Sequence, residues 1–223
     1  MGQFIAIEGG DGSGKGTQAR LLIDWLRSQG REVLELDFPQ YSQPSALYVE
    51  RYLNGEYGAA NDVPADLASL AYALDRYSTK ARVNEFLTKL DGIVIANRYV
   101  ASNMAHQGTK FDDETRRKQF YDEILHLEYE ILGIAKPDLN IVLLVPADIS
   151  QANVDKKAAR SYTTKKRDIH EADATHLDKA KRNYEEICEL YPEEFTAIEC
   201  MDGGTMRTID EIQVDIRNKL IKK

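Results

Sequence analysis

Short apolar runs alternate along the chain with longer stretches in which apolar residues recur at helical spacing. Five runs have the length of strands, and most are rich in Ile, Val or Leu; they cover residues 4–7, 33–36, 92–96, 139–145 and 195–198. Between them the spacing predicts helices near residues 15–29, 64–90, 112–134, 148–158, 171–190 and 208–221. This alternation is typical of βαβ units, so we predict an α/β fold around a five-stranded parallel sheet that is buried on both faces.

Size and charge narrow the class of protein. The chain has 223 residues with no internal repeat and no Pro- or Gly-rich linker, which predicts a single domain over residues 1–223. With 29 Lys and Arg against 37 Asp and Glu, the net charge of -8 disfavours binding to nucleic acid. No stretch approaches the ~20 apolar residues that cross a bilayer. The two cysteines, Cys188 and Cys200, lack metal-binding spacing, so we expect free thiols in the cytoplasm.

A glycine-rich segment between the first apolar run and the first helix is the strongest functional signal. It places strand, turn and helix in the order that binds phosphate, because backbone N–H groups and the helix N-terminus then point at phosphate oxygens. We therefore predict an ATP site made by Gly9, Gly10, Asp11, Gly12, Ser13, Gly14, Lys15, Gly16 and Thr17. Lys15 is the predicted catalytic lysine of this loop. Mg²⁺ is expected as cofactor, because phosphoryl transfer needs its charge. Gly16 stands where a Ser or Thr hydroxyl normally binds Mg²⁺, so the protein ligand of the metal stays open.

Four motifs together resemble the thymidylate kinase family over nearly the whole chain. They are the I-x-x-E-G-x-D-G-x-G-K segment from Ile5 to Lys15, Phe38-Pro39, Asp75-Arg76 and Arg98-Tyr99. The resemblance implies a P-loop NTPase-like, three-layer α/β/α fold. It also implies transfer of a phosphoryl group from ATP to dTMP, and a homodimer.

The resemblance assigns roles around the acceptor. It implies that Arg98 grips the acceptor monophosphate, that Asp11 lies near the sugar 3′-hydroxyl, and that Tyr72 and Arg76 bind the thymine, with Tyr72 where the family usually has Phe. By helical geometry alone Tyr72 and Arg76 lie about 200° from a stripe of Leu67, Leu70 and Leu74, which we expect to face the core. On that evidence alone a solvated i, i+4 pair is the better interpretation, and only the resemblance favours base binding.

Further residues are candidates for the acceptor pocket. Pro39 would fix the exit of the chain from the second strand, and Phe38 could form one wall of the pocket. Ser102, Asn103 and Gln107 follow Arg98 on a predicted helix, where they either address the base edge or form an exposed polar face. His106 and His176 suggest no chemistry of their own.

A basic segment near residues 158–171 interrupts two helical patterns, and we predict a mobile lid there. A lid can close positive charge over the transferred phosphoryl group and exclude water. Gly12 occupies the place where one subgroup of thymidylate kinases has a catalytic Arg, so this chain resembles the subgroup that supplies the charge from its lid. Arg160 and Arg167 are the predicted catalytic residues, unranked against Lys165 and Lys166.

Three alternatives remain open on the sequence. A deoxynucleoside kinase needs a carboxylate as general base after the second strand, and residues 38–41 offer none. Another monophosphate kinase would share residues 14–18 of the loop. The third is a nucleotide-binding regulator with little activity. Gly16 lacks the usual hydroxyl, and Asn97 stands where the family usually has Asp, so both weaken the expected support for Mg²⁺.

Overall fold

The computed structural model describes residues 2–155 and 174–221. Its central feature is a five-stranded parallel sheet in the order β2-β3-β1-β4-β5. The strands are β1 (Gln3–Gly9), β2 (Glu32–Asp37), β3 (Gly92–Asn97), β4 (Leu139–Leu144) and β5 (Phe195–Glu199). The chain builds β2 and β3 on one side of β1 and then crosses to β4 on the other. This change of direction creates a switch point at the carboxyl ends of the strands, where such sheets bind ligands.

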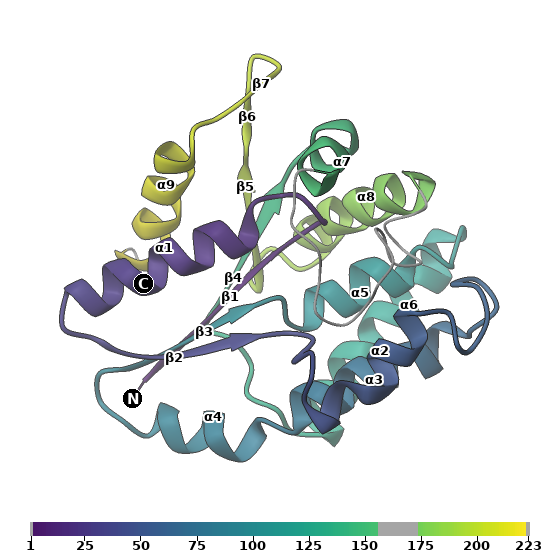
Figure 1. Cartoon of the computed structure of the whole chain (residues 1–223), viewed down its shortest axis with the longest axis horizontal. Coiled ribbons are helices and arrows are strands. Elements are labelled where there is room, and N and C mark those ends of the chain that lie inside the picture. Colours follow the sequence, from purple (N-terminus) through teal and green to yellow (C-terminus); the bar gives the residue numbers. More distant parts are fainter. Residues whose placement is uncertain (1, 156–173, 222–223) are drawn as a thin grey trace.

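Helices cover both faces of the sheet (Figure 1). On one face lie α1 (Lys15–Ser28) and α9 (Ile209–Ile221), which pack with Ile5 and Ile7 of β1. On the other lie α5 (Val100–Gly108), α6 (Glu114–Leu125) and α8 (Ala174–Leu190), which pack with Phe4 and Ala6. Alternate residues of a strand point to opposite faces, so an almost continuous apolar run serves both layers. The predicted three-layer α/β/α architecture is confirmed.

The remaining elements connect these strands and helices. They are η1 (Pro44–Ala46), α2 (Leu47–Leu53), α3 (Ala65–Tyr77), α4 (Lys80–Leu87), the π-helical turn η2 (His126–Ile131), α7 (Ala147–Asp155), and an antiparallel hairpin of β6 (Met201–Asp202) and β7 (Thr205–Met206). No helix in the described part of the chain is long and apolar enough to cross a membrane. The predicted lid at 158–171, with Arg160, Lys165, Lys166 and Arg167, lies outside the described residues.

The single helix predicted over residues 64–90 is wrong, because the structure divides it into α3 and α4. The Ser78 hydroxyl donates to the carbonyl of Asp75 at 2.7 Å, and the Thr79 hydroxyl donates to the carbonyl of Arg76 at 2.8 Å. These local bonds offer the backbone an alternative to helical continuation. The apolar spacing continues through the break, which is why the sequence pattern does not reveal it.

The orientation of α3 also differs from the prediction. Leu67, Leu70 and Leu74 are exposed, at 62%, 39% and 44%, whereas Ala73 and Arg76 are buried. Small side chains on the inner side let α3 approach α5 closely. The leucine stripe therefore faces outward and the predicted base-binding arginine faces inward.

Candidate active site

The glycine-rich loop after β1 forms a tight turn into α1. Gly12 has φ +79°, and a Cβ there would lie 2.0 Å from the carbonyl oxygen of Ser150, so only glycine fits. The Lys15 ammonium donates to the carbonyl of Gly10 at 2.9 Å. The Ser13 hydroxyl is buried without a hydrogen-bond partner among the described residues, and this unpaired donor suits a phosphate oxygen. The loop thus has the geometry expected of a phosphate cradle.

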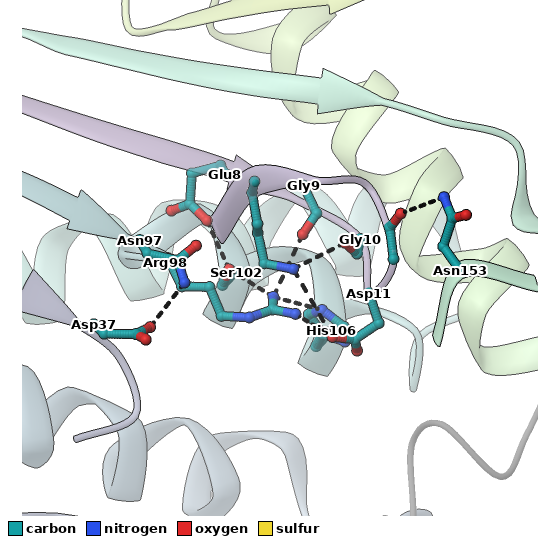
Figure 2. A network of polar contacts seen from close by, with 12 residues as sticks. Glu8, Gly9, Gly10, Asp11, Asp37, Asn97, Arg98, Ser102, His106 and Asn153 are labelled. Carbon is teal, nitrogen blue, oxygen red and sulfur yellow. Dashed lines mark hydrogen bonds and ion pairs between the residues drawn. The ribbon is translucent and has the colours of Figure 1, made fainter. Parts of the chain in front are cut away.

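Arg98 leaves the end of β3 with φ +65°, a strained conformation for a bulky residue. Its backbone N–H donates to the carbonyl of Ile7 at 2.9 Å and ties it to β1. Its guanidinium donates to the Ser102 hydroxyl at 3.1 Å and to Asp11 (Figure 2). The strained backbone turns the side chain toward the phosphate loop instead of along the strand.

Charges converge on Asp11. Its Oδ1 accepts from Arg98 and lies 3.8 Å from the Lys15 ammonium. Burial opposes the charge of Arg98, but Asp11, Tyr184 and Glu8 outweigh that effect and raise its pKa. Two cations therefore meet one carboxylate between the phosphate loop and the end of β3.

Glu8, near the end of β1, supports this cluster through hydrogen bonds. Its carboxylate accepts from the backbone N–H of Tyr99 at 2.8 Å and from the Ser102 hydroxyl at 2.6 Å, and it is fully buried. Desolvation raises its pKa, while Ser102, Arg98 and Tyr99 act in the opposite direction. Glu8 thus fixes both Ser102 and the backbone of Tyr99, the residue that directly follows Arg98.

Two histidines form a pair next to Arg98, and His106 is the member that contacts it. His106 is stacked with His176 at a ring-centroid distance of 5.4 Å, and its Nε2 lies 3.3 Å from the Arg98 guanidinium. Both rings are buried. Burial, Arg98 and the second histidine hold the pKa of His106 well below its ordinary value. Because His176 lies in the first turn of α8, the pair links that helix to Arg98.

Arg76 occupies a buried ion pair. Its Nε and Nη2 both donate to the carboxylate of Glu128, each at 2.6 Å, and Glu128 comes from the π-helical turn η2. The Asn103 amide also donates to Glu128, at 3.1 Å. Burial lowers the pKa of Arg76, but the charge and hydrogen bonds of Glu128 have the larger effect, so the pKa is raised above its ordinary value. Among the described residues, Nη1 of Arg76 has no hydrogen-bond partner.

Other predicted acceptor residues surround this pair. The Oδ1 of Asn103 and the Nε2 of Gln107 are buried without partners among the described residues. Tyr72 is half-buried, and its ring centroid lies 6.4 Å from that of Tyr52. An unpaired acceptor and an unpaired donor near an aromatic ring suit the edge of a base.

Phe38 is 3% exposed and packs on Tyr99 at a centroid distance of 5.8 Å, so it belongs to the core. Pro39 follows through a cis peptide bond and is half-buried. The structure therefore places Phe38 in the core against Tyr99, the residue after Arg98, and not at an open pocket wall.

The ends of β2 and β3 carry a second polar pair. Asp37 lies opposite Asn97 in the parallel register, and the Asn97 amide donates to the Asp37 carboxylate at 2.8 Å (Figure 2). Neighbouring protein partly desolvates the Asp37 carboxylate and raises its pKa, against the opposing effects of Asn97, Arg98 and Lys15, although the residue as a whole is exposed to solvent. Asp37 was not among the predicted site residues, and its position as the last residue of β2 is the only signal in the sequence.

A metal ion would need help from the nucleotide at this site. No group of three or more His, Cys, Asp or Glu side chains in the described residues could hold an ion alone. Candidate protein oxygens are the carboxylate of Asp37 and, by its place in the sequence, the hydroxyl of Thr17, the first hydroxyl after Lys15. Hard oxygen ligands of this kind, completed by phosphates and water, fit Mg²⁺.

Comparison with known proteins is consistent with this geometry. The sequence model of the family described as thymidylate kinase matches residues 7–203. The thymidylate kinase of Mycobacterium tuberculosis is 33% identical over 82% of this chain and 85% of its own length, and that of Caulobacter vibrioides is 29% identical over 82% and 84%. A solved structure of thymidylate kinase from Candida albicans superposes with a TM-score of 0.72 at 25% identity, covering 99% of this chain and 92% of the other. The chain therefore belongs to the thymidylate kinase family.

Proposed function

We propose that this protein transfers the γ-phosphoryl group of ATP to dTMP, giving ADP and dTDP. The observation that carries the proposal is the convergence of Lys15 and Arg98 on Asp11, between the phosphate loop and the end of β3. Lys15 is placed to bind the phosphates of the donor. Arg98, with its fork of donors, is placed to bind the phosphate of the acceptor.

The chemistry needs positioning more than a base. The phosphate of dTMP is already ionised at neutral pH, so its oxygen can attack without losing a proton. Lys15, the loop N–H groups and Arg98 would hold donor and acceptor in line and offset their charge. Asp11 would then exchange its contacts with the two cations for a contact with the sugar of the acceptor.

The base would lie over α3 and α5. Tyr72 would stack on the thymine ring, and Nη1 of Arg76 would donate to a base carbonyl while Glu128 holds the rest of the guanidinium. The buried Oδ1 of Asn103 and Nε2 of Gln107 supply the further acceptor and donor that a pyrimidine edge needs. Ser102 has a different task, since it is bonded to Glu8 and Arg98.

Mg²⁺ is the metal we propose for the donor nucleotide. It would offset the negative charge of the donor phosphates. Arg160 and Arg167 of the lid remain predicted sources of positive charge for the transferred group.

We also propose a homodimer that acts in the cytoplasm. Exposed apolar side chains of α2 and α3, among them Tyr48, Leu67 and Leu70, line an open groove. Burying such a face against a second copy removes apolar surface from water. Cys188 and Cys200 are free, as expected of a protein in a reducing compartment.

A turnover assay tests the activity and the acceptor together. Purified protein with ATP and Mg²⁺ is offered dTMP, dUMP, the other monophosphates and free thymidine in parallel. We expect dTMP to give the highest kcat/KM and Arg98→Ala to lower it by about 100-fold or more, whereas Arg116→Ala, which removes an exposed ion pair with Glu123 on α6, leaves it unchanged. A preference for free thymidine would contradict the proposal and point to a nucleoside kinase.

A further inference from the structure

Asp37 and Asn97 form a unit at the edge of the sheet that faces the phosphate loop. They end the neighbouring strands β2 and β3, lie opposite each other in register, and are joined by the 2.8 Å bond from the Asn97 amide to the Asp37 carboxylate. The partners are 60 residues apart in sequence, so the sheet alone brings them together. Figure 2 shows the pair next to Arg98, at the end of the cluster away from Asn153.

The pair adjoins the place of the missing loop hydroxyl. Gly16 follows Lys15 where a Ser or Thr would normally reach the metal. A Cβ at Gly16 would lie 3.6 Å from the Asn97 amide nitrogen. A polar group of this pair therefore stands within van der Waals contact of the position from which the hydroxyl would extend.

Three carboxylates surround Lys15 and Arg98, and their availability differs. Glu8 is fully buried and accepts two hydrogen bonds, and Asp11 is engaged by both cations. Asp37 is exposed, and its Oδ2 has no hydrogen-bond partner among the described residues. Of the three, only Asp37 can turn an anionic oxygen toward a cation without giving up a contact.

The orientation of Asn97 serves Asp37. Its amide nitrogen donates to the carboxylate, while its own oxygen is buried without a partner in the described part of the chain. An unpaired buried oxygen is unfavourable. The hydrogen bond to Asp37 is therefore the contact that favours this orientation of the Asn97 amide.

We propose that Asp37 is the carboxylate that holds the hydrated Mg²⁺ of the donor nucleotide, and that Asn97 is its positioning residue. The acidic group that the family usually has at position 97 is supplied here from the neighbouring strand. The inference rests on the proposed function only in taking a magnesium nucleotide as the phosphoryl donor.

The test measures metal coupling without turnover. The affinity of the protein for the β,γ-imido analogue of ATP is measured with chelator and with saturating Mn²⁺, and bound Mn²⁺ is counted by electron paramagnetic resonance. In Asp37→Asn we expect the tightening by Mn²⁺ to fall about tenfold, the usual effect of losing a residue that orients metal ligands. Metal-free binding should be equal or tighter, because a negative charge beside the phosphates is gone.

Controls separate this role from a structural one. Glu35→Gln removes the same charge from the same strand and should leave both affinities unchanged. A variant that merely disturbs the fold would weaken binding with and without metal, and that result for Asp37→Asn, or an unchanged tightening by Mn²⁺, would overturn the proposal.

A double-mutant cycle tests the role of Asn97. Asn97→Ala should lose part of the metal coupling, and the double variant with Asp37→Asn should lose no more than Asp37→Asn alone. Fully additive losses would overturn the assignment of Asn97 as the positioning residue. These binding measurements contain no dTMP. If dTMP failed as a substrate in the turnover assay, the role of Asp37 in metal binding would still stand, so the proposed function and this inference can be refuted separately.

Discussion

The charge of Arg76 is buried at 2% exposure and neutralised by a residue 52 positions away in the chain. Removing one partner of such a pair leaves the other charged and desolvated, which typically costs about 3–5 kcal/mol. We expect Glu128→Gln to lower the free energy of unfolding by that amount, measured by urea denaturation. Glu123→Gln breaks the exposed pair with Arg116 and should cost at most about 1 kcal/mol. Equal effects of the two changes would contradict this account of the buried pair.

His106 gives the folded protein a pH dependence of known sign. The unfolded chain takes up a proton on this histidine near pH 6.5, whereas burial, Arg98 and His176 keep the folded form neutral. The unfolded state therefore binds more protons as the pH falls below 6.5, and stability decreases, by up to about 1.4 kcal/mol per pH unit. We expect urea denaturation between pH 7 and 5.5 to show a smaller decrease in His106→Gln than in the wild type. His126→Gln, at an exposed position, should keep the wild-type profile, and identical slopes in all three proteins would refute the argument.

The sequence predicts the residues of the site that act through local geometry and misses those that act through distant partners. The phosphate loop is visible because strand, glycines and Lys15 are consecutive. Arg98 stands out only through the family motif, since nothing local marks its strained φ. Glu128 and Asp37 are acidic residues without a motif, and their roles depend on neighbours that only the fold supplies.

At the scale of elements, the loop between β1 and α1 depends on a glycine that touches another helix. At Gly12 the side chain of alanine would meet the backbone of Ser150 in α7 and would also require a positive φ. Gly30, after the end of α1, has φ +78°, but a Cβ there would have no other atom within 4 Å. We expect Gly30→Ala to lower the free energy of unfolding by about 1–2 kcal/mol and Gly12→Ala by a further 1–3 kcal/mol. Thermal or urea denaturation compares the two, and a similar loss in both would argue against the close contact with α7.

Strands are better predicted than helices in this chain. Each predicted strand overlaps an observed one, because buried parallel strands are continuous apolar runs. The breaks after α3 and within residues 112–134 depend on hydroxyl groups that bond to the backbone and on a π-helical turn, and neither changes the apolar spacing. The outward direction of the leucines of α3 is missed for another reason. Leucines at helical spacing indicate an apolar contact but do not say whether it lies in the core or on the surface.

At the scale of the whole molecule, the homodimer we propose rests on that outward leucine face. Leu67, Leu70 and Leu74 of α3 lie beside exposed tyrosines of the segment before it, and together they form the groove proposed as the dimer contact. A charge in the middle of a buried apolar contact would lose its hydration without gaining a partner. We therefore expect Leu70→Asp to sediment as a monomer at concentrations where the wild type is a dimer. Leu90→Asp is the matched control, since Leu90 is 79% exposed and lies after α4, away from the groove, and it should remain dimeric. A wild-type monomer, or a dimeric Leu70→Asp, would show that this face is not the contact between the two copies.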